Sequence, residues 1–140
     1  MSDIRNKLEQ LTDEFEFLED WENKYRHIID LGRKLPQLEP YQKSDSNKVS
    51  GCASQVWLIS DFSPETGLVK FSGESDSSLV QGLLSIFIFI YSEATPMEII
   101  SLPPAEVFEK LGLNDALTPS RANGLKSIAA KIMAFAHLNS

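Results

Sequence analysis

The sequence predicts an α+β fold in which several helices pack against a small antiparallel sheet of about three strands. Apolar residues recur at helical spacing near both ends of the chain, over residues 4–18 and 125–136. Between them, residues 56–71 are rich in β-branched and aromatic side chains, which favour strands. The chain has 140 residues and no internal repeat, so we expect one domain over residues 1–140.

Two amphipathic helices are expected at the N-terminal end. The apolar positions of the first follow intervals of three or four residues: Ile4, Leu8, Leu11, Phe15 and Leu18. Asp20 is a suitable N-cap for the second helix, whose apolar positions begin at Trp21 and whose end is marked by Gly32 and Pro36. The short connection predicts that the two helices pack as a hairpin.

A polar connection and a β-hairpin come next. Residues 36–48 show little periodicity and have the composition of an exposed segment. Residues 56–62 and 68–71 are predicted to form antiparallel strands, because a turn with Pro64 and Gly67 separates them. A short strand near Val49 is expected to add the third member of the sheet.

The second half of the chain is predicted to be helical. Residues 79–91 have the composition of a strand, but their length and a capping serine, Ser77 or Ser78, favour a buried helix. Thr95-Pro96 and Thr118-Pro119 each place a capping hydroxyl before a proline, so both are expected to start helices.

Charge and hydropathy exclude several classes of function. The chain has 13 basic and 20 acidic residues and a formal charge of -7, which disfavours binding to nucleic acid. Residues 1–7 lack the apolar stretch of a signal peptide, so we expect a cytoplasmic location. The longest apolar run, residues 83–91, is shorter than the ~20 residues that cross a membrane, and no membrane association is expected.

The chain contains one cysteine, Cys52. A single cysteine excludes an intrachain disulfide and a metal site built from several thiolates of this chain. His27 and His137 have no pattern of ligands beside them, so no bound metal is expected. Gly51 allows unusual backbone angles and close approach by a partner. Cys52 is therefore either a small packed side chain or a single reactive thiol at a loop tip.

The residues around Cys52 resemble a known family. Residues 51–57 read Gly-Cys-Ala-Ser-Gln-Val-Trp, which is similar to the cysteine loop of the SufE/CsdE sulfur acceptors of iron–sulfur cluster assembly. One visible departure is Ala53, where some members carry glutamine, and another is Glu74, where an aspartate can occur. Further similar motifs follow in order along the chain: residues 21–36, Gly73-x-Ser75-Asp76, Val80-x-Gly82-Leu83, Thr95-Pro96 and residues 117–125.

The resemblance implies a fold similar to that of the U-type cluster scaffold proteins and favours a helix over residues 79–91. It also implies that a pyridoxal-phosphate-dependent cysteine desulfurase, SufS-like or CsdA-like, passes persulfide sulfur to Cys52 and is stimulated by this chain. The sulfur then goes to a downstream acceptor such as a Suf scaffold complex. The pyridoxal phosphate is expected on the desulfurase, and no cofactor is expected on this chain.

The resemblance also marks residues that support the cysteine. Gly51, Ser54 and Gln55 belong to the cysteine loop and are expected to hold it or to meet the desulfurase. Arg121 is a candidate electrostatic aid to the thiolate. An arginine in the first turn of a helix is unfavourably placed, so we expect an acidic partner for it, with Asp76 or Glu74 as the candidates.

Three other functions remain open from the sequence. The chain is alternatively an adaptor that activates the desulfurase by docking alone, or a scaffold on which a cluster is built, although one cysteine is few for a cluster site. A thiol redox sensor is a third interpretation, disfavoured because no resolving cysteine is present. Whether the donor belongs to the Suf or the Csd branch, and whether the chain is a monomer or a homodimer, are also open.

Overall fold

The computed structural model describes residues 3–140, apart from the side chain of Asp115, and shows an α+β fold. Two helices open the chain, α1 (Asp3–Phe17) and α2 (Trp21–Arg33). Asp20 caps α2 as expected, because its carboxylate accepts a hydrogen bond of 2.8 Å from the amide of Asn23. The predicted amphipathic pattern of α1 is confirmed, since its buried positions are Ile4, Leu8, Leu11 and Phe15.

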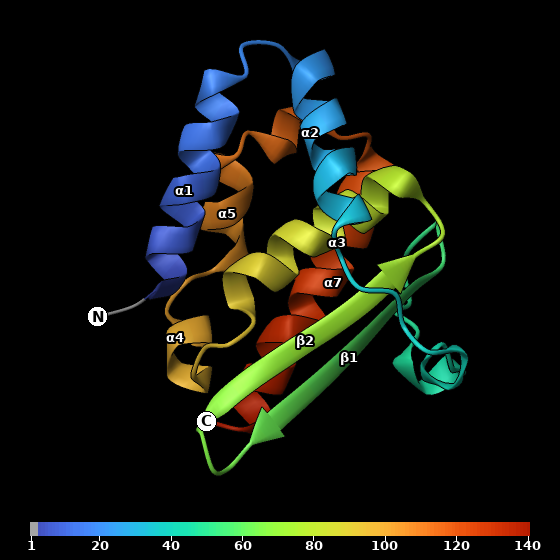
Figure 1. Ribbon diagram of the computed structural model, residues 1–140, viewed down its shortest axis with the longest axis vertical. Helices are drawn as coiled ribbons and strands as arrows, with labels where there is room; N and C mark the ends of the chain where they lie inside the picture. Colours follow the sequence, from blue (N-terminus) through green and yellow to red (C-terminus); the bar gives the residue numbers. More distant parts are fainter. Residues whose placement is uncertain (1–2) are drawn as a thin grey trace.

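The two N-terminal helices form a looser pair than the expected hairpin. They touch near their connection, where the ring of His27 contacts Phe15 and lies 3.1 Å from the carboxylate of Glu14. Beyond that point the helices diverge, and each packs against α3 (Ser78–Tyr91) (Figure 1). Their apolar faces are therefore buried mainly by α3 rather than by one another.

The sheet has two strands, β1 (Val56–Ser63) and β2 (Leu68–Ser75), where about three were expected. They pair antiparallel in a register that runs from Val56 opposite Ser75 to Ser63 opposite Leu68. The expected strand near Val49 is reduced to one bridge between Lys48 and Trp57. The connection before it contains two short 3-10 turns, η1 (Pro40–Gln42) and η2 (Asp45–Asn47).

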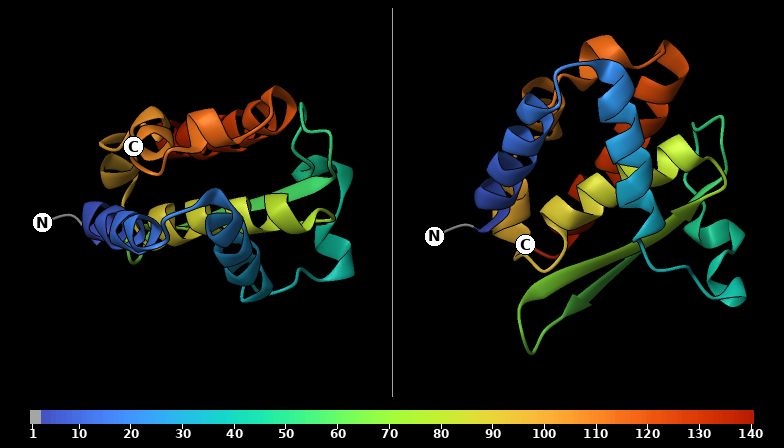
Figure 2. Two further views of the ribbon diagram at one scale, coloured as in Figure 1. Left: turned by 90° about the horizontal axis from the view of Figure 1, so that it is seen from above. Right: turned by 45° about the horizontal axis from the view of Figure 1, so that its top comes forward.

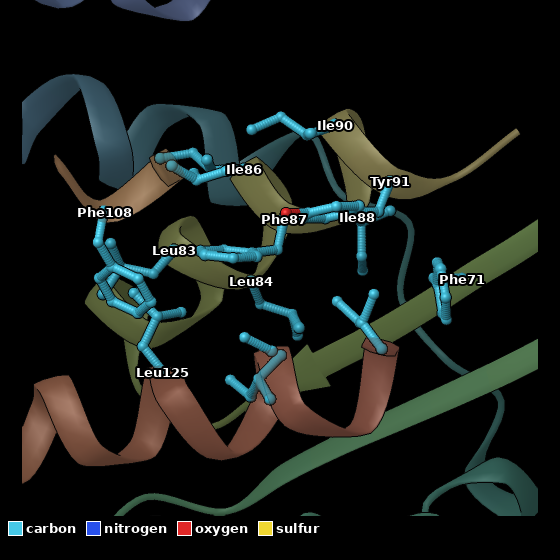
Figure 3. Close-up of a cluster of buried hydrophobic side chains, with 14 of the residues drawn as sticks. Phe71, Leu83, Leu84, Ile86, Phe87, Ile88, Ile90, Tyr91, Phe108 and Leu125 are labelled. Atoms are coloured by element: carbon cyan, nitrogen blue, oxygen red, sulfur yellow. The ribbon is translucent and has the colours of Figure 1, made fainter. Parts of the chain in front are cut away.

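The central element is α3, and its assignment as a helix is confirmed. Ser77 caps it by accepting a hydrogen bond from the amide of Val80. Figure 3 shows Phe87 of α3 within the buried cluster, and its ring centroid lies 5.8 Å from that of Phe108. Nine of its 14 residues are buried. Apolar side chains therefore occupy most faces of the helix, which gives it the composition of a strand.

The helices α2 and α3 cross at very short range. A Cβ placed on Gly82 would lie 2.1 Å from the carbonyl oxygen of Ile28, and one on Gly32 would lie 2.6 Å from the amide nitrogen of Gly82. Only residues without a side chain allow this approach of backbone to backbone. The crossing fixes α2 on α3.

The chain ends in four helices, α4 (Pro96–Ile100), α5 (Pro104–Lys110), α6 (Leu113–Ala116) and α7 (Pro119–Leu138). Thr95 and Thr118 cap α4 and α7 as predicted. Figure 2 shows α7 as a separate layer behind α3 and the sheet, and it packs on α3 and β1. No helix within residues 3–140 is long and apolar enough to cross a membrane.

Candidate functional site

The loop that carries Cys52 spans residues 50–55, between η2 and β1. A hydrogen bond of 2.8 Å from the amide of Val49 to the carbonyl of Val56 closes its base. The loop packs against the first half of α7, where Gly124 lies next to Cys52 and Ser127 lies next to Gly51. The site is thus formed by two segments that are distant in the sequence, since Cys52 and Gly124 are 72 residues apart.

Gly51 is required by the backbone of the loop. Its φ of +84° lies in the left-handed region, which side chains other than glycine rarely adopt. A Cβ at this position would also lie 2.8 Å from the hydroxyl oxygen of Ser127. Gly51 therefore both turns the chain and lets the loop lie close to α7, as the loop sequence suggested.

The thiol of Cys52 is half-buried and faces α7. Its Sγ lies 3.5 Å from the carbonyl oxygen of Gly124, to which the S–H donates a weak hydrogen bond. Burial raises the pKa of the Cys52 thiol, because desolvation disfavours the charged thiolate. In this position the sulfur is held as a neutral thiol, the less nucleophilic of its two forms.

A small cavity of about 20 Å³ adjoins the thiol. Residues of three elements line it, namely the loop, α3 and the first turns of α7, and one side is open to solvent. Its wall is mainly apolar and small, and it includes one charged side chain. The lining residues are Cys52, Ala53, Ser54, Val80, Leu83, Ser120, Arg121, Gly124 and Leu125.

Asp76 holds the C-terminal end of the loop. Its carboxylate accepts a hydrogen bond of 3.0 Å from the amide of Gln55, and its own amide donates one of 3.2 Å to the carbonyl of Gln55. This exchange extends the pairing of β1 with β2 by one residue, since Asp76 directly follows β2. Asp76 therefore contacts the loop through the backbone of Gln55.

Glu74 holds the connection that precedes the loop. Its carboxylate lies 2.6 Å from Nζ of Lys43 and accepts a hydrogen bond of 2.9 Å from the amide of Leu38. Partial burial opposes ionisation, but these contacts from Lys43 and Leu38 outweigh it and lower the pKa of Glu74. The Lys43 ammonium also lies 5.7 Å from the ring centroid of Trp57. Glu74 thus ties residues 38–43 to the sheet.

The expected pairing of Arg121 with Asp76 or Glu74 is wrong. Glu74 pairs with Lys43, and Asp76 binds backbone of the loop. Arg121 is exposed in the first turn of α7 and lines the cavity beside Cys52, and within residues 3–140 its side chain forms no ion pair. The partners of Glu74 and Asp76 are Lys43 and the backbone of Gln55. The periodicity of the sequence does not reveal which groups these two carboxylates contact.

The remaining loop residues differ in their placement. Ser54 is half-buried and lines the cavity, whereas Gln55 is exposed and engages Asp76 through its backbone. The sequence reasoning gave no role to Gly124, Ser127 or Lys131 of α7. The signal for them was their spacing of three or four residues, which places them on one helical face beside the apolar stripe.

The described residues hold no group of three or more His, Cys, Asp or Glu side chains arranged to bind a metal ion. Around the cavity the structure places the thiol of Cys52, the side chain of Arg121 and Gly124, whose backbone carbonyl accepts from the thiol.

The fold and the site define a small α+β protein that presents one half-buried cysteine on a loop held against a helix. The model of the family described as SufE, Fe-S metabolism associated domain, matches residues 9–136. The chain therefore belongs to the SufE family, and the resemblance seen in its sequence is confirmed. The family associates the chain with iron–sulfur metabolism.

Two relatives and one solved structure are similar to this chain. An uncharacterized SufE-like protein of Rhizobium etli is 44% identical over 127 residues, which cover 89% of this chain and 86% of the relative. Another from Rhizobium meliloti is 42% identical, with 89% and 91% covered. The solution structure of a hypothetical protein from Thermus thermophilus has a TM-score of 0.77 at 19% identity and covers 95% of both chains. This last likeness concerns the fold alone.

Proposed function

We propose that this chain accepts sulfur on Cys52 from a pyridoxal-phosphate-dependent cysteine desulfurase, stimulates that enzyme, and delivers the sulfur for iron–sulfur cluster assembly. The observation that carries the proposal is the placement of a single thiol beside a small, partly open cavity in a chain of the SufE family. The desulfurase supplies the persulfide through its own cofactor, and this chain supplies the acceptor sulfur.

The transfer is a thiol exchange without net oxidation. The thiolate of Cys52 attacks the outer sulfur of the donor persulfide, and a new S–S bond forms while the donor S–S bond breaks. The donor cysteine leaves as a thiolate, which takes up the proton released by Cys52 directly or through water. Cys52 then carries the transferred sulfur as its own persulfide.

The cavity beside Cys52 suits a sulfur that has to be protected. Its volume of about 20 Å³ is on the scale of one water molecule, for which a cavity of roughly 10–15 Å³ is the lower limit. One additional sulfur atom is comparable in size. Its mostly apolar wall would limit the access of water and reductants to the persulfide, and Ser54 contributes to that wall.

The resting position of Cys52 protects the thiol and also restrains its reactivity. The S–H donates to the carbonyl of Gly124, and a thiolate at the same place would face that oxygen without a proton between them. Attack on the donor therefore requires the loop to move away from α7, and docking of the desulfurase triggers this movement. Arg121 at the cavity wall then offers the positive charge that favours the thiolate and the anionic persulfide.

The other residues of the site act as supports in this proposal. Gly51 provides the turn that lets the loop close on α7, and Asp76 and Glu74 fasten its two flanks. Gln55, which is exposed and lies three residues after Cys52 on the same loop, is expected to contact the desulfurase. The loop thus moves between fixed ends.

The decisive experiment is intact-mass analysis of the protein after incubation with a SufS-type desulfurase and cysteine. We expect one added sulfur on Cys52, removed by dithiothreitol. Stable binding to the desulfurase without any sulfur adduct would overturn the proposal and indicate an adaptor that acts by docking.

The closed position of the loop predicts how alkylation of the free protein responds to Gly124. A Cβ at Gly124 would lie 3.4 Å from Sγ of Cys52, an ordinary contact, and its three nearest neighbours all belong to Cys52. A valine adds two methyl groups to that carbon, which we expect to push the loop away from α7. We expect Gly124→Val to raise the iodoacetamide rate several-fold and Gly124→Ala to leave it near the wild-type value.

The pH profile of the same reaction gives an independent check. Because burial raises the pKa of Cys52, the wild-type rate should rise at higher pH than that of an ordinary thiol. In Gly124→Val the midpoint should fall toward the ordinary value as the thiol becomes solvated. Equal rates and midpoints in all three proteins would show that the loop is already open in solution.

A further inference from the structure

The basic residues of this acidic chain are unevenly placed. The whole protein carries a formal charge of -7, yet α7 contains Arg121, Lys126 and Lys131 and no aspartate or glutamate in its 20 residues. Segment 40–55, which leads into the cysteine loop, contains Lys43 and Lys48 against one acidic residue, Asp45. Even when Glu74 and Asp76 beside the loop are counted with Asp45, these five basic residues outnumber three acidic ones, so the local charge around Cys52 is opposite in sign to that of the molecule.

Three of these cations frame the loop. Arg121 lines the cavity beside Cys52, and Lys131 lies beyond the loop on the same side of α7, where its Nζ donates a hydrogen bond of 3.4 Å to the carbonyl of Lys48. Lys48 directly precedes the hydrogen bond that closes the loop at Val49. At 1.5 Å per residue, Arg121 and Lys131 are separated by about 15 Å along the helix. We call Lys48, Arg121 and Lys131 the basic frame.

The basic frame is exposed, and its charges are not neutralised within the chain. All three side chains are exposed, and over residues 3–140 none of them forms an ion pair with a carboxylate. The acidic residues beside the loop are otherwise engaged, since Glu74 binds Lys43 and Asp76 accepts from the amide of Gln55. Elsewhere basic residues do find carboxylates, as Arg5 does with Glu106 at 2.7 Å.

We propose that the basic frame docks on an acidic surface that borders the active site of the sulfur donor. This inference rests on the proposed function and names the chemistry of the partner at the same site. Opposite charges around the two reacting sulfurs accelerate encounter and orient it, while like charges on the rest of this acidic chain disfavour other orientations. The frame surrounds Cys52, so the docked donor faces the loop.

Charge reversal at the basic frame tests the inference. Binding of a SufS-type desulfurase is measured by stopped-flow or surface plasmon resonance as a function of salt. We expect Lys48→Glu and Lys131→Glu each to slow association by about 3- to 10-fold, with most of the loss in the on-rate, and to flatten its dependence on salt. The control is Lys110→Glu, an exposed lysine of α5 whose neighbours lie on α1, which should associate as the wild type does.

Lys48→Glu separates charge from the hydrogen bond of Lys131, because it reverses a charge and leaves the accepting backbone carbonyl in place. At residue 131, Lys131→Arg keeps both the charge and a donor, and Lys131→Met removes both. Association should follow charge, so Lys131→Arg should bind like the wild type. Wild-type association rates for both glutamate variants, with native circular dichroism, would overturn the inference, as would binding that is independent of salt.

Failure of this inference is distinguishable from failure of the proposed function. Sulfur loading of the wild-type protein is followed by mass and does not depend on these substitutions. Normal loading together with charge-independent binding would reject only the acidic docking surface. Absence of loading in the wild type would reject the sulfur-carrier function itself.

Discussion

Replacement of Cys52 by serine is expected to abolish sulfur transfer to this chain and delivery beyond it. A hydroxyl forms no persulfide and is not ionised near neutral pH, so no S–S bond can form at residue 52. The measurement is the passage of radiolabelled sulfur from cysteine, through the desulfurase, to the chain and then to a downstream acceptor. With Cys52→Ser, transfer to the downstream acceptor should fall to the background level measured when this chain is omitted.

The serine variant also separates the carrier from the adaptor. Serine is nearly the size of cysteine and keeps a donor for the carbonyl of Gly124, so the fold and docking should survive. Ser50→Ala, at an exposed position of the same loop, is the matched control and should carry sulfur normally. If Cys52→Ser stimulates the desulfurase as fully as the wild type does, docking alone accounts for the activity.

The second large effect is expected at the crossing of α2 and α3. Gly82→Ala places a Cβ 2.1 Å from the carbonyl oxygen of Ile28 and 2.6 Å from its Cγ2. The obstacle is backbone, which cannot rotate away, so the helices have to separate. We expect a loss of about 3 kcal/mol or more in the free energy of unfolding, measured by urea denaturation.

Gly124→Ala is the matched control for Gly82→Ala, since both glycines lie inside helices. The added Cβ at Gly124 meets its nearest neighbour at 3.4 Å, and alanine is favoured over glycine in helices by up to ~1 kcal/mol. Its stability should equal or exceed that of the wild type. If Gly82→Ala is as stable as Gly124→Ala, the two helices can separate at the crossing at little cost, and the expectation is wrong.

Much of the fold follows from local patterns. The helices α1, α2 and α7 have one apolar face each, and the caps at Asp20, Thr95 and Thr118 mark where helices begin. The periodicity of α3 is hidden because most of its residues are buried. The short helices α5 and α6 carry too few turns for a periodic signal and were not predicted.

The site was only partly accessible from the sequence. Cys52 and Gly51 could be singled out from one short motif. Gly124, whose carbonyl accepts the hydrogen bond from the thiol, lies 72 residues from Cys52 along the chain. Lys43, the partner of Glu74, lies 31 residues from it. Such pairs are decided by how helices and strands pack, and the choice of Asp76 or Glu74 for Arg121 failed for that reason.

The hydrogen bond between Val49 and Val56 sets a geometric limit on the chemistry. Cys52 lies three residues from Val49, and an extended chain spans at most about 3.3–3.6 Å per residue. The α-carbon of Cys52 can therefore lie at most about 10 Å from that of Val49 as long as this hydrogen bond is kept. If the donor sulfur lies deeper in its active site than this reach allows, the donor has to bring that sulfur outward on a mobile segment of its own.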